Sequence, residues 1–214
     1  MHAVFLDLDG TLADSRDDLA TAVNLTRRDY GLASLPPAAV AGFVGEGMRR
    51  LVERALPERP AEVDAALARA RGHYRAHLLD RTALYPGVAE GLRSLTEQGW
   101  RCAVVTSKLR EFVDPLLAGL GIANRFGAVV GGGETAVLKP DPEPLRLAAG
   151  RLGLPALAGS WMAGDHFTDL AAGRRAGMRC CYCRYGFGDP RGEPFDLAVD
   201  SLVELAAHLG AAPR

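Results

Sequence analysis

Short runs of apolar residues alternate with amphipathic stretches through the last two-thirds of the chain. The apolar runs predict strands at residues 4–8, 102–106, 126–130, 161–163 and 179–182. Between them, apolar residues recur at a spacing of three to four and predict helices at residues 88–97, 111–120, 143–152 and 169–176. Strands that alternate with helices in this way are typical of βαβ units. We therefore expect an α/β fold, a Rossmann-like parallel sheet with helices on both faces.

The stretch from residue 14 to residue 82 has a different pattern, because it shows helical periodicity and no convincing strand. Leu19, Val23 and Tyr30 fall on one predicted helix face, and Leu67 and Tyr74 fall on another. Prolines separate the predicted helices. We therefore predict two domains: an α/β core formed by residues 1–13 and 83–214, and an all-helical insert formed by residues 14–82. The insert is expected at the mouth of the sheet, over whatever binds there.

The composition is that of an ordinary globular protein. Of the 214 residues, 48% are apolar and 24% are charged, which argues against disordered and fibrous classes. The formal net charge of −1 gives no electrostatic footprint for nucleic acid or an anionic membrane. No apolar run is long enough for a membrane span, and Asp7 interrupts the first one, so no signal peptide is expected. Cys180, Cys181 and Cys183 crowd onto one segment, which predicts buried thiols rather than a disulfide framework, and the cytoplasm as compartment.

Polar side chains suited to metal and phosphate chemistry stand next to the predicted strands. In an open parallel sheet, ligands bind beyond the carboxyl ends of the strands. The residues near these ends are Asp7, Asp9 and Gly10 after the first strand, Thr106, Ser107 and Lys108 after the second, Lys139 before the fourth, and Asp165 with Asp169 after the fourth. Carboxylates, hydroxyls and an ammonium group are thus expected at one rim of the sheet.

The carboxylates at this rim predict a Mg²⁺ site, because Mg²⁺ prefers oxygen ligands, usually one or two carboxylates completed by water and substrate phosphate. Two unit charges about 4 Å apart repel by roughly 4 kcal/mol at an effective dielectric near 20. A phosphate dianion could therefore approach Asp7 beside Asp165 only if a dication and a lysine neutralise the site. Thr106 and Lys139 are suited to hold the phosphoryl group. An aspartate such as Asp7 can then attack phosphorus, while Asp9 protonates the leaving oxygen and later activates water.

The order and spacing of these residues resemble the four motifs of the haloacid dehalogenase-like superfamily. The motifs stand here as Asp7-Leu8-Asp9-Gly10-Thr11, Thr106, Lys139-Pro140 and Gly164-Asp165-His166-Phe167-Thr168-Asp169. The resemblance implies that Asp7 is the phosphoryl-accepting nucleophile, that Asp9 is the general acid and base, and that the helical insert is a cap domain. It also implies the binding residues: Thr106, Ser107, Lys139 and Gly10 for phosphate, and Asp7, Asp165 and the Asp9 backbone carbonyl for Mg²⁺. Asp169 would support the metal indirectly, through water or a hydrogen bond.

Further segments resemble bacterial phosphoglycolate phosphatases. They are Phe43-Val44-Gly45-Glu46-Gly47, Tyr85-Pro86-Gly87-Val88 and Tyr185-Gly186. Ser107 and His166 depart from that pattern, where Asn and a small hydroxyl residue are usual. The resemblance implies 2-phosphoglycolate as the substrate. The turn Gly45-Glu46-Gly47, followed by Arg49, is then the expected contact for the substrate's carboxylate, because free amides at a helix N-terminus attract anions.

Several alternatives remain open from the sequence. The chain could be a phosphatase or mutase for another small phosphoester, such as a sugar phosphate, or a non-catalytic relative that binds a phosphorylated ligand. Residues 131–136 formally fit a dinucleotide fingerprint, but prolines follow where a helix should open, so no NAD site is expected. His73 and His77 have metal spacing on a helix but no third ligand, and they are expected at the surface. A small phosphorylated metabolite is the expected partner, and the oligomeric state is not predicted.

Overall fold

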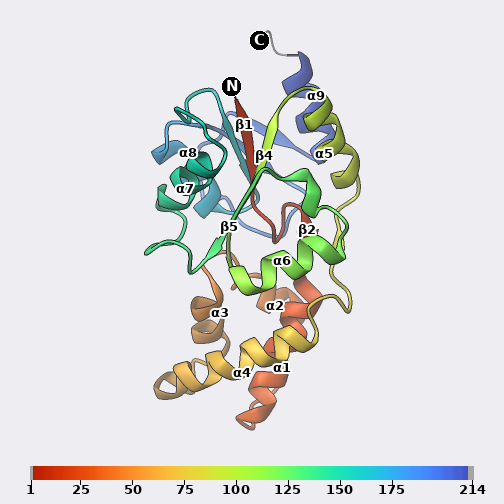
Figure 1. Cartoon of the computed structure of the whole chain (residues 1–214). Helices are drawn as coiled ribbons and strands as arrows, with labels where there is room; N and C mark the ends of the chain where they lie inside the picture. The colour runs from red at the N-terminus through yellow and green to blue at the C-terminus, as the bar shows by residue number, and fades with distance from the viewer. Residues whose placement is uncertain (1, 212–214) are drawn as a thin grey trace.

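The computed structural model describes residues 2–211 and contains a six-stranded parallel sheet (Figure 1). Its strands, in spatial order, are β5 (Ala128–Gly132), β4 (Arg101–Leu109), β1 (Ala3–Leu6), β6 (Trp161–Gly164), β7 (Arg179–Cys183) and β8 (Leu197–Val199). Each neighbouring pair runs parallel. From β1 the chain builds one half of the sheet through β4 and β5, and the other half through β6, β7 and β8. The strand order therefore reverses at β1, which is where open α/β sheets form their ligand crevice.

Helices cover both faces of this sheet, because its central strand is apolar on both sides. The helices are α5 (Val88–Glu97), α6 (Arg110–Gly119) and α9 (Leu202–Ala211) on one face, and α7 (Glu143–Arg151) and α8 (Phe167–Arg175) on the other. Val4 and Leu6 of β1 pack toward the first group, whereas Ala3 and Phe5 pack toward the second. This alternation follows from the two-residue period of a strand. The predicted α/β fold with helices on both faces is confirmed.

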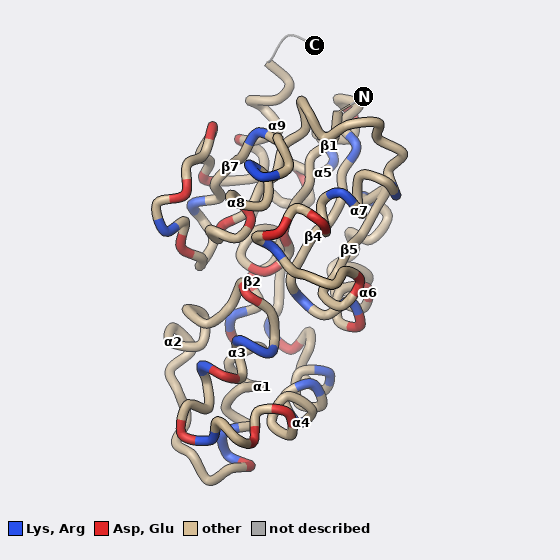
Figure 2. The backbone as a smooth tube through the Cα atoms, turned by 90° about the vertical axis from the view of Figure 1, so that its left-hand side faces the viewer, with Lys and Arg blue, Asp and Glu red and all other residues tan. Residues whose placement is uncertain are grey.

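A lobe of helices lies beyond the carboxyl ends of the strands, at the end of the molecule opposite α9 (Figure 1). This helical lobe consists of α1 (Arg16–Asp29), α2 (Pro37–Ala41), α3 (Met48–Ala55) and α4 (Val63–Ala76). It has its own apolar cluster, which includes Val23, Val52 and Ala70 and is separate from the two clusters of the sheet. Acidic and basic residues are interspersed along both parts of the chain (Figure 2).

The chain passes between the sheet and the helical lobe twice, and the two connecting segments pair with each other. β2 (Ala13–Asp14) and β3 (Ala83–Leu84) form a short antiparallel ribbon. The buried carboxylate of Asp18 in α1 accepts hydrogen bonds from the backbone N–H groups of Arg81 and Thr82 and from the Thr82 hydroxyl, at 2.6 to 3.1 Å. The two connecting segments are therefore tied together by strand pairing and by a side chain.

Most predicted elements occur, with some ends shifted. The helix predicted at residues 88–97 has the same bounds as α5, whereas β5 begins two residues later than predicted, after a 3₁₀ turn (Ala123–Arg125). The two-residue strands β2 and β3 and the final pair β8 and α9 were not predicted. Position 14 lies in β2, so a strand and not a helix occupies the start of the predicted insert. Of the helices that the structure describes, none combines the length and apolarity needed to cross a membrane.

Candidate active site

The loop after β1 carries Asp7 and Asp9. The Asp7 N–H donates to the carbonyl of Ala163 at 3.0 Å and so continues the pairing of β1 with β6 by one residue. The chain then turns tightly, because the Leu8 carbonyl accepts a hydrogen bond from the N–H of Ala13 at 2.9 Å. Leu8 packs in the apolar core, whereas both aspartates line a cavity between the sheet and the helical lobe.

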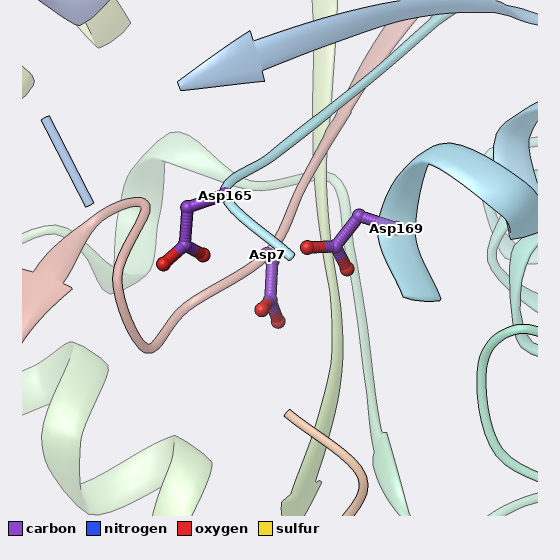
Figure 3. A group of neighbouring side chains, drawn as sticks. All are labelled: Asp7, Asp165 and Asp169. Carbon is purple, nitrogen blue, oxygen red and sulfur yellow. The ribbon is translucent and has the colours of Figure 1, made fainter. Parts of the chain in front are cut away.

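Three buried carboxylates meet at the end of the sheet, those of Asp7, Asp165 and Asp169 (Figure 3). One oxygen from each lies within 4.8 Å of the others. Asp165 directly follows β6, and Asp169 lies in the first turn of α8, so a strand end and a helix start bring both to Asp7. The three residues are 5%, 1% and 0% exposed. Among residues 2–211 this is the only group of three side chains with metal-binding atoms this close.

Asp165 is fixed in place by the loop that follows β7 and by Gly10. Its Oδ2 accepts hydrogen bonds from the N–H groups of Gly188 at 2.7 Å and Phe187 at 3.1 Å. Gly10 has a φ of +84°, and a Cβ there would lie 1.9 Å from Oδ2 of Asp165, so only glycine fits. The Gly10 N–H donates to the Ala13 carbonyl at 2.9 Å. This N–H is therefore engaged inside the loop, and the expected contact of Gly10 with phosphate stays a prediction.

Lys139 supplies the ammonium group at the carboxylate cluster and is almost fully buried. Its Nζ donates to Oδ1 of Asp169 at 2.6 Å and to the carbonyl of Val105 at 2.7 Å. Nζ also lies 3.0 Å from Oδ1 of Asp7. This last contact is an ion pair without hydrogen-bond geometry, since Oδ1 of Asp7 has no hydrogen-bond partner in the described chain. A buried carboxylate oxygen that makes an ion pair but no hydrogen bond is free to contact a further ligand.

The cluster carries three carboxylates and one ammonium group. This excess of negative charge contributes to the raised pKa values of Asp165 and Asp169. Burial, followed by repulsion from Asp169 and Asp7, raises the pKa of Asp165 well above its ordinary value. Burial also raises the pKa of Asp169 to about 7, although Lys139 opposes the shift. Burial acts to lower the pKa of Lys139, but the two neighbouring carboxylates outweigh it and raise that pKa. A further cation would favour the ionised form of these carboxylates, and an all-oxygen donor set of this kind fits Mg²⁺.

A second buried ion pair, between Asp9 and Lys108, lies in the same cavity. Oδ1 of Asp9 accepts a hydrogen bond from the Ser15 hydroxyl at 2.5 Å, and Oδ2 lies 2.9 Å from Nζ of Lys108. Nζ also donates to the hydroxyl of Tyr74, in α4, at 2.6 Å. Burial acts to lower the pKa of Lys108, but Asp9 and Tyr74 outweigh it and raise that pKa, so the ammonium group stays charged. Burial raises the pKa of Tyr74 to about 12, so its hydroxyl keeps its proton at neutral pH.

Thr106 and Ser107 are buried near the end of β4 and line the cavity. The register of β4 against β5 shifts between Val105 and Leu109, so regular pairing is interrupted at both residues. The Thr106 hydroxyl accepts a hydrogen bond from the Lys108 N–H at 3.3 Å. The Ser107 hydroxyl has no hydrogen-bond partner among the residues that the structure describes. A buried hydroxyl in this state is costly unless a ligand or water meets it.

The cavity is small and has two different walls. It encloses about 40 Å³, which is room for a few water molecules. The sheet contributes the polar wall described above. The helical lobe contributes mainly apolar side chains, among them Leu19, Val44, Met48 and Leu51. The lobe therefore closes over the acidic end of the sheet and leaves space for a small ligand.

Only part of the turn Gly45-Glu46-Gly47, which was expected to contact the substrate, lines the cavity. Gly45 and Gly47 line the cavity. Gly45 lies against the ring of His166, because a Cβ at this glycine would come within 2.6 Å of the ring. The Glu46 carboxylate is instead paired with Arg54 and lies 3.6 Å from Arg191.

Arg49 is not among the residues that line the cavity, and its expected contact with the substrate stays a prediction. Its side chain is 55% exposed and pairs with Asp64 and Glu53. Arg49 comes directly after Met48, the first residue of α3, and Met48 lines the cavity. Consecutive helical residues are turned by about 100°, so a residue next to an inward-facing one lies on another face of the helix.

The clustered cysteines and the pair His73 and His77 lie outside this site. Cys181 packs in the cluster on the α5 and α9 side of the sheet, whereas Sγ of Cys180 contacts the carbonyl of Leu170 in α8, on the other side. His73 is hydrogen-bonded to Asp29 and His77 to Asp80, so the two imidazoles have separate partners. These contacts give both histidines a structural explanation.

Comparison with known proteins gives consistent matches. The chain matches the family model of haloacid dehalogenase-like hydrolases over residues 4–183. It is 42% identical over 213 residues to a phosphoglycolate phosphatase of Cupriavidus necator, a match that covers 98% of this chain and 91% of the relative. It is 39% identical to a phosphoglycolate phosphatase of Chromobacterium violaceum, covering 96% and 95%. A crystal structure described as a predicted phosphoglycolate phosphatase from Haemophilus somnus 129PT matches with a TM-score of 0.88 at 28% identity, covering 98% of both chains.

Proposed function

The chain belongs to the haloacid dehalogenase-like hydrolases, and we propose that it is a Mg²⁺-dependent phosphatase that hydrolyses 2-phosphoglycolate through an aspartyl-phosphate on Asp7. The observation that carries the proposal is the position of Asp7. Its carboxylate lies beside Lys139 and within reach of Asp165 and Asp169, and it lines the cavity between the sheet and the helical lobe. A nucleophile, a cation site and an ammonium group thus meet where a phosphoryl group would react.

Asp7 and Asp165 would hold the Mg²⁺, with the backbone carbonyl of Asp9 as a further oxygen ligand. Asp169 would support the site indirectly, because its carboxylate is bonded to Lys139 and to the N–H of His166. When bound, Mg²⁺ would neutralise and polarise the phosphoryl oxygens. The excess of carboxylates supports this assignment, and so does the Asp7 oxygen that makes no hydrogen bond.

The residues of the chain itself would carry two displacement steps. A carboxylate oxygen of Asp7 attacks phosphorus, the bond from phosphorus to the ester oxygen breaks, and protonated Asp9 gives its proton to that oxygen. Asp9 then takes a proton from a water molecule that attacks the aspartyl-phosphate, which releases inorganic phosphate and restores Asp7. Thr106, Ser107 and Lys139 would hold the phosphoryl group during both steps. The free hydroxyl of Ser107 supports this role.

The helical lobe would act as a cap, with residues 14–82 as the cap domain and residues 1–13 and 83–214 as the core. The β2–β3 ribbon and the Asp18 contacts tie the two connecting segments together, so the lobe could move on a single hinge. Its apolar wall would exclude water from the reacting groups when closed.

The relatives named phosphoglycolate phosphatase support 2-phosphoglycolate as the substrate. The small cavity supports a short leaving group. A phosphate-release screen with Mg²⁺, comparing 2-phosphoglycolate with hexose phosphates and other metabolites, tests the proposal. We expect 2-phosphoglycolate to have the highest kcat/KM, and Asp7→Asn to lower its turnover by about 1,000-fold or more. A higher kcat/KM for another phosphoester would overturn the assignment of 2-phosphoglycolate as the substrate. An active Asp7→Asn variant would overturn the assignment of Asp7 as the nucleophile.

A further inference from the structure

Lys108 and Tyr74 form a donor-rich corner of the cavity that the proposed phosphoryl chemistry does not use. Lys108 comes from the sheet and Tyr74 from α4 of the helical lobe, and both line the cavity. They are 8% and 1% exposed. Nζ of Lys108 lies 2.6 Å from the Tyr74 hydroxyl and 4.4 Å from the centre of its ring. The pair therefore joins the two parts of the molecule at the cavity.

The hydrogen-bond inventory of this pair leaves two donors unused. An ammonium group has three N–H donors. In Lys108 one is directed to Asp9 and one to Tyr74, and the described chain offers no acceptor for the third. The Tyr74 hydroxyl accepts the bond from Lys108, and the same part of the chain offers no acceptor for its own proton. Each group already has a partner, and its remaining donor is suited to an anionic ligand in the cavity that both residues line.

The position of Lys108 beside Asp9 limits what that anion can be. Asp9 would protonate the ester oxygen of the substrate, so this oxygen must lie close to its carboxylate. The Nζ of Lys108 is 2.9 Å from Oδ2 of Asp9. An α-carboxylate, which is one carbon atom away from the ester oxygen, is close enough to contact Lys108 while the ester oxygen contacts Asp9.

No other positive charge is available for this contact. Lys108 is the one cationic side chain in the cavity wall, over the range that the structure describes. Lys139 is engaged by Asp169 and Val105, and Arg49 points to solvent. The remaining wall of the helical lobe is mainly apolar and offers little to the hydroxyl groups of a sugar.

We propose that Lys108 and Tyr74 together bind the carboxylate of the leaving group and make the enzyme selective for phosphoesters of α-hydroxy carboxylates. This inference rests on the proposed function and assigns the carboxylate contact to this pair instead of the turn Gly45-Glu46-Gly47. Lys108 is then a specificity-determining residue. Its contact with Tyr74 makes recognition depend on the closed position of the helical lobe.

A matched pair of substrates tests the inference. 2-Phosphoglycolate and 2-hydroxyethyl phosphate have the same length and differ in a carboxylate against a neutral hydroxymethyl group. We expect Lys108→Met to lower the ratio of their kcat/KM values by at least about 30-fold, because it removes a charged contact from a buried site. Tyr74→Phe should lower the ratio by about 3- to 10-fold, since one neutral donor is lost. Arg50→Met removes an exposed charge from α3 and should leave the ratio unchanged.

Equal losses on both substrates in Lys108→Met would overturn the inference, because Lys108 would then only position Asp9. A wild-type enzyme that does not prefer 2-phosphoglycolate would instead refute the proposed substrate, and the inference with it. Binding gives an independent readout. In an Asp7→Asn background with Mg²⁺, calorimetry should show that Lys108→Met weakens the binding of 2-phosphoglycolate by at least about 30-fold. The binding of 2-hydroxyethyl phosphate should weaken much less. Unchanged affinity for 2-phosphoglycolate would overturn the assignment.

Discussion

Lys139 is the residue on which the charge balance of the carboxylate cluster depends. Its ammonium group contacts both Asp7 and Asp169, and all three side chains are buried. We expect Lys139→Met to lower the free energy of unfolding of the metal-free protein by about 3 kcal/mol or more, because it leaves buried carboxylates without their counter-charge. Urea denaturation, followed by circular dichroism in the presence of a chelator, measures the change.

A double variant separates charge from packing in this prediction. Asp169→Asn removes one of the two carboxylates that Lys139 neutralises while keeping its shape. Lys139→Met combined with Asp169→Asn should therefore be more stable than Lys139→Met alone. A double variant that is less stable than the single one would show that the loss arises from packing and not from unpaired charge.

At the residue scale, the sequence predicts those site residues that follow strands. Asp7 and Asp165 can be found because each comes directly after an apolar run, and parallel strands end at the same edge. Tyr74 could not be found, because helical periodicity marks it as a core position and says nothing of what its hydroxyl meets. The roles expected for Gly10 and Arg49 are not supported by their contacts in the structure, for a related reason. Sequence gives a residue's place along a turn or helix, but packing decides where its N–H or side chain points.

At the scale of elements, the turn before α3 is shaped by Gly45. This residue has a φ of +113°, and a Cβ would lie 2.6 Å from the ring of His166. We expect Gly45→Ala to lower kcat/KM about tenfold, because both the backbone conformation and the contact with His166 force the turn away from the core. Steady-state kinetics with 2-phosphoglycolate measures the effect.

Gly72 provides the matched control for this substitution. It lies in α4 on the exposed side, and a Cβ there would meet nothing within 4 Å. Gly72→Ala should keep kcat/KM and raise stability by about 0.5–1 kcal/mol, because alanine favours the helix. Full activity of Gly45→Ala would mean that the turn does not have to lie against His166.

The strands that the sequence missed share a physical cause. β2 and β3 have two residues each and β8 has three, which is too short for a two-residue alternation to be recognised. Their pairing depends on partners far away in the chain, such as Cys181 opposite Leu197. By contrast, α5 has the predicted bounds, because ten residues of clear periodicity lie between Gly87 and the turn at Gly99. The local pattern thus gave the bounds of α5, whereas tertiary contact decides these short strands.

At the scale of the whole molecule, closing the helical lobe over the sheet buries the carboxylates and links their ionisation to folding. The pKa of Asp169 is about 7 in the folded protein, against an ordinary value of 3.8, and that of Asp165 is also raised. A group with a raised pKa binds more protons in the folded state than in the unfolded state between those two values. The metal-free protein should therefore lose stability as the pH rises from about 4 to about 7. Mg²⁺ acts in the opposite direction, because it binds the ionised carboxylates.

We therefore expect the thermal stabilisation by Mg²⁺ to grow with pH. At pH 5.5, protons compete for Asp169 and Asp165, so a fixed Mg²⁺ concentration should raise Tm only slightly. At pH 8, above the pKa of about 7 of Asp169, fewer protons compete, and the same concentration should raise Tm by several degrees more. Differential scanning calorimetry at the two pH values, with and without a chelator, measures both shifts, and Asp165→Asn is the control that should weaken the response at pH 8. Equal Mg²⁺ shifts at the two pH values would show that the carboxylate cluster is ionised throughout this range, and that its protonation does not oppose metal binding.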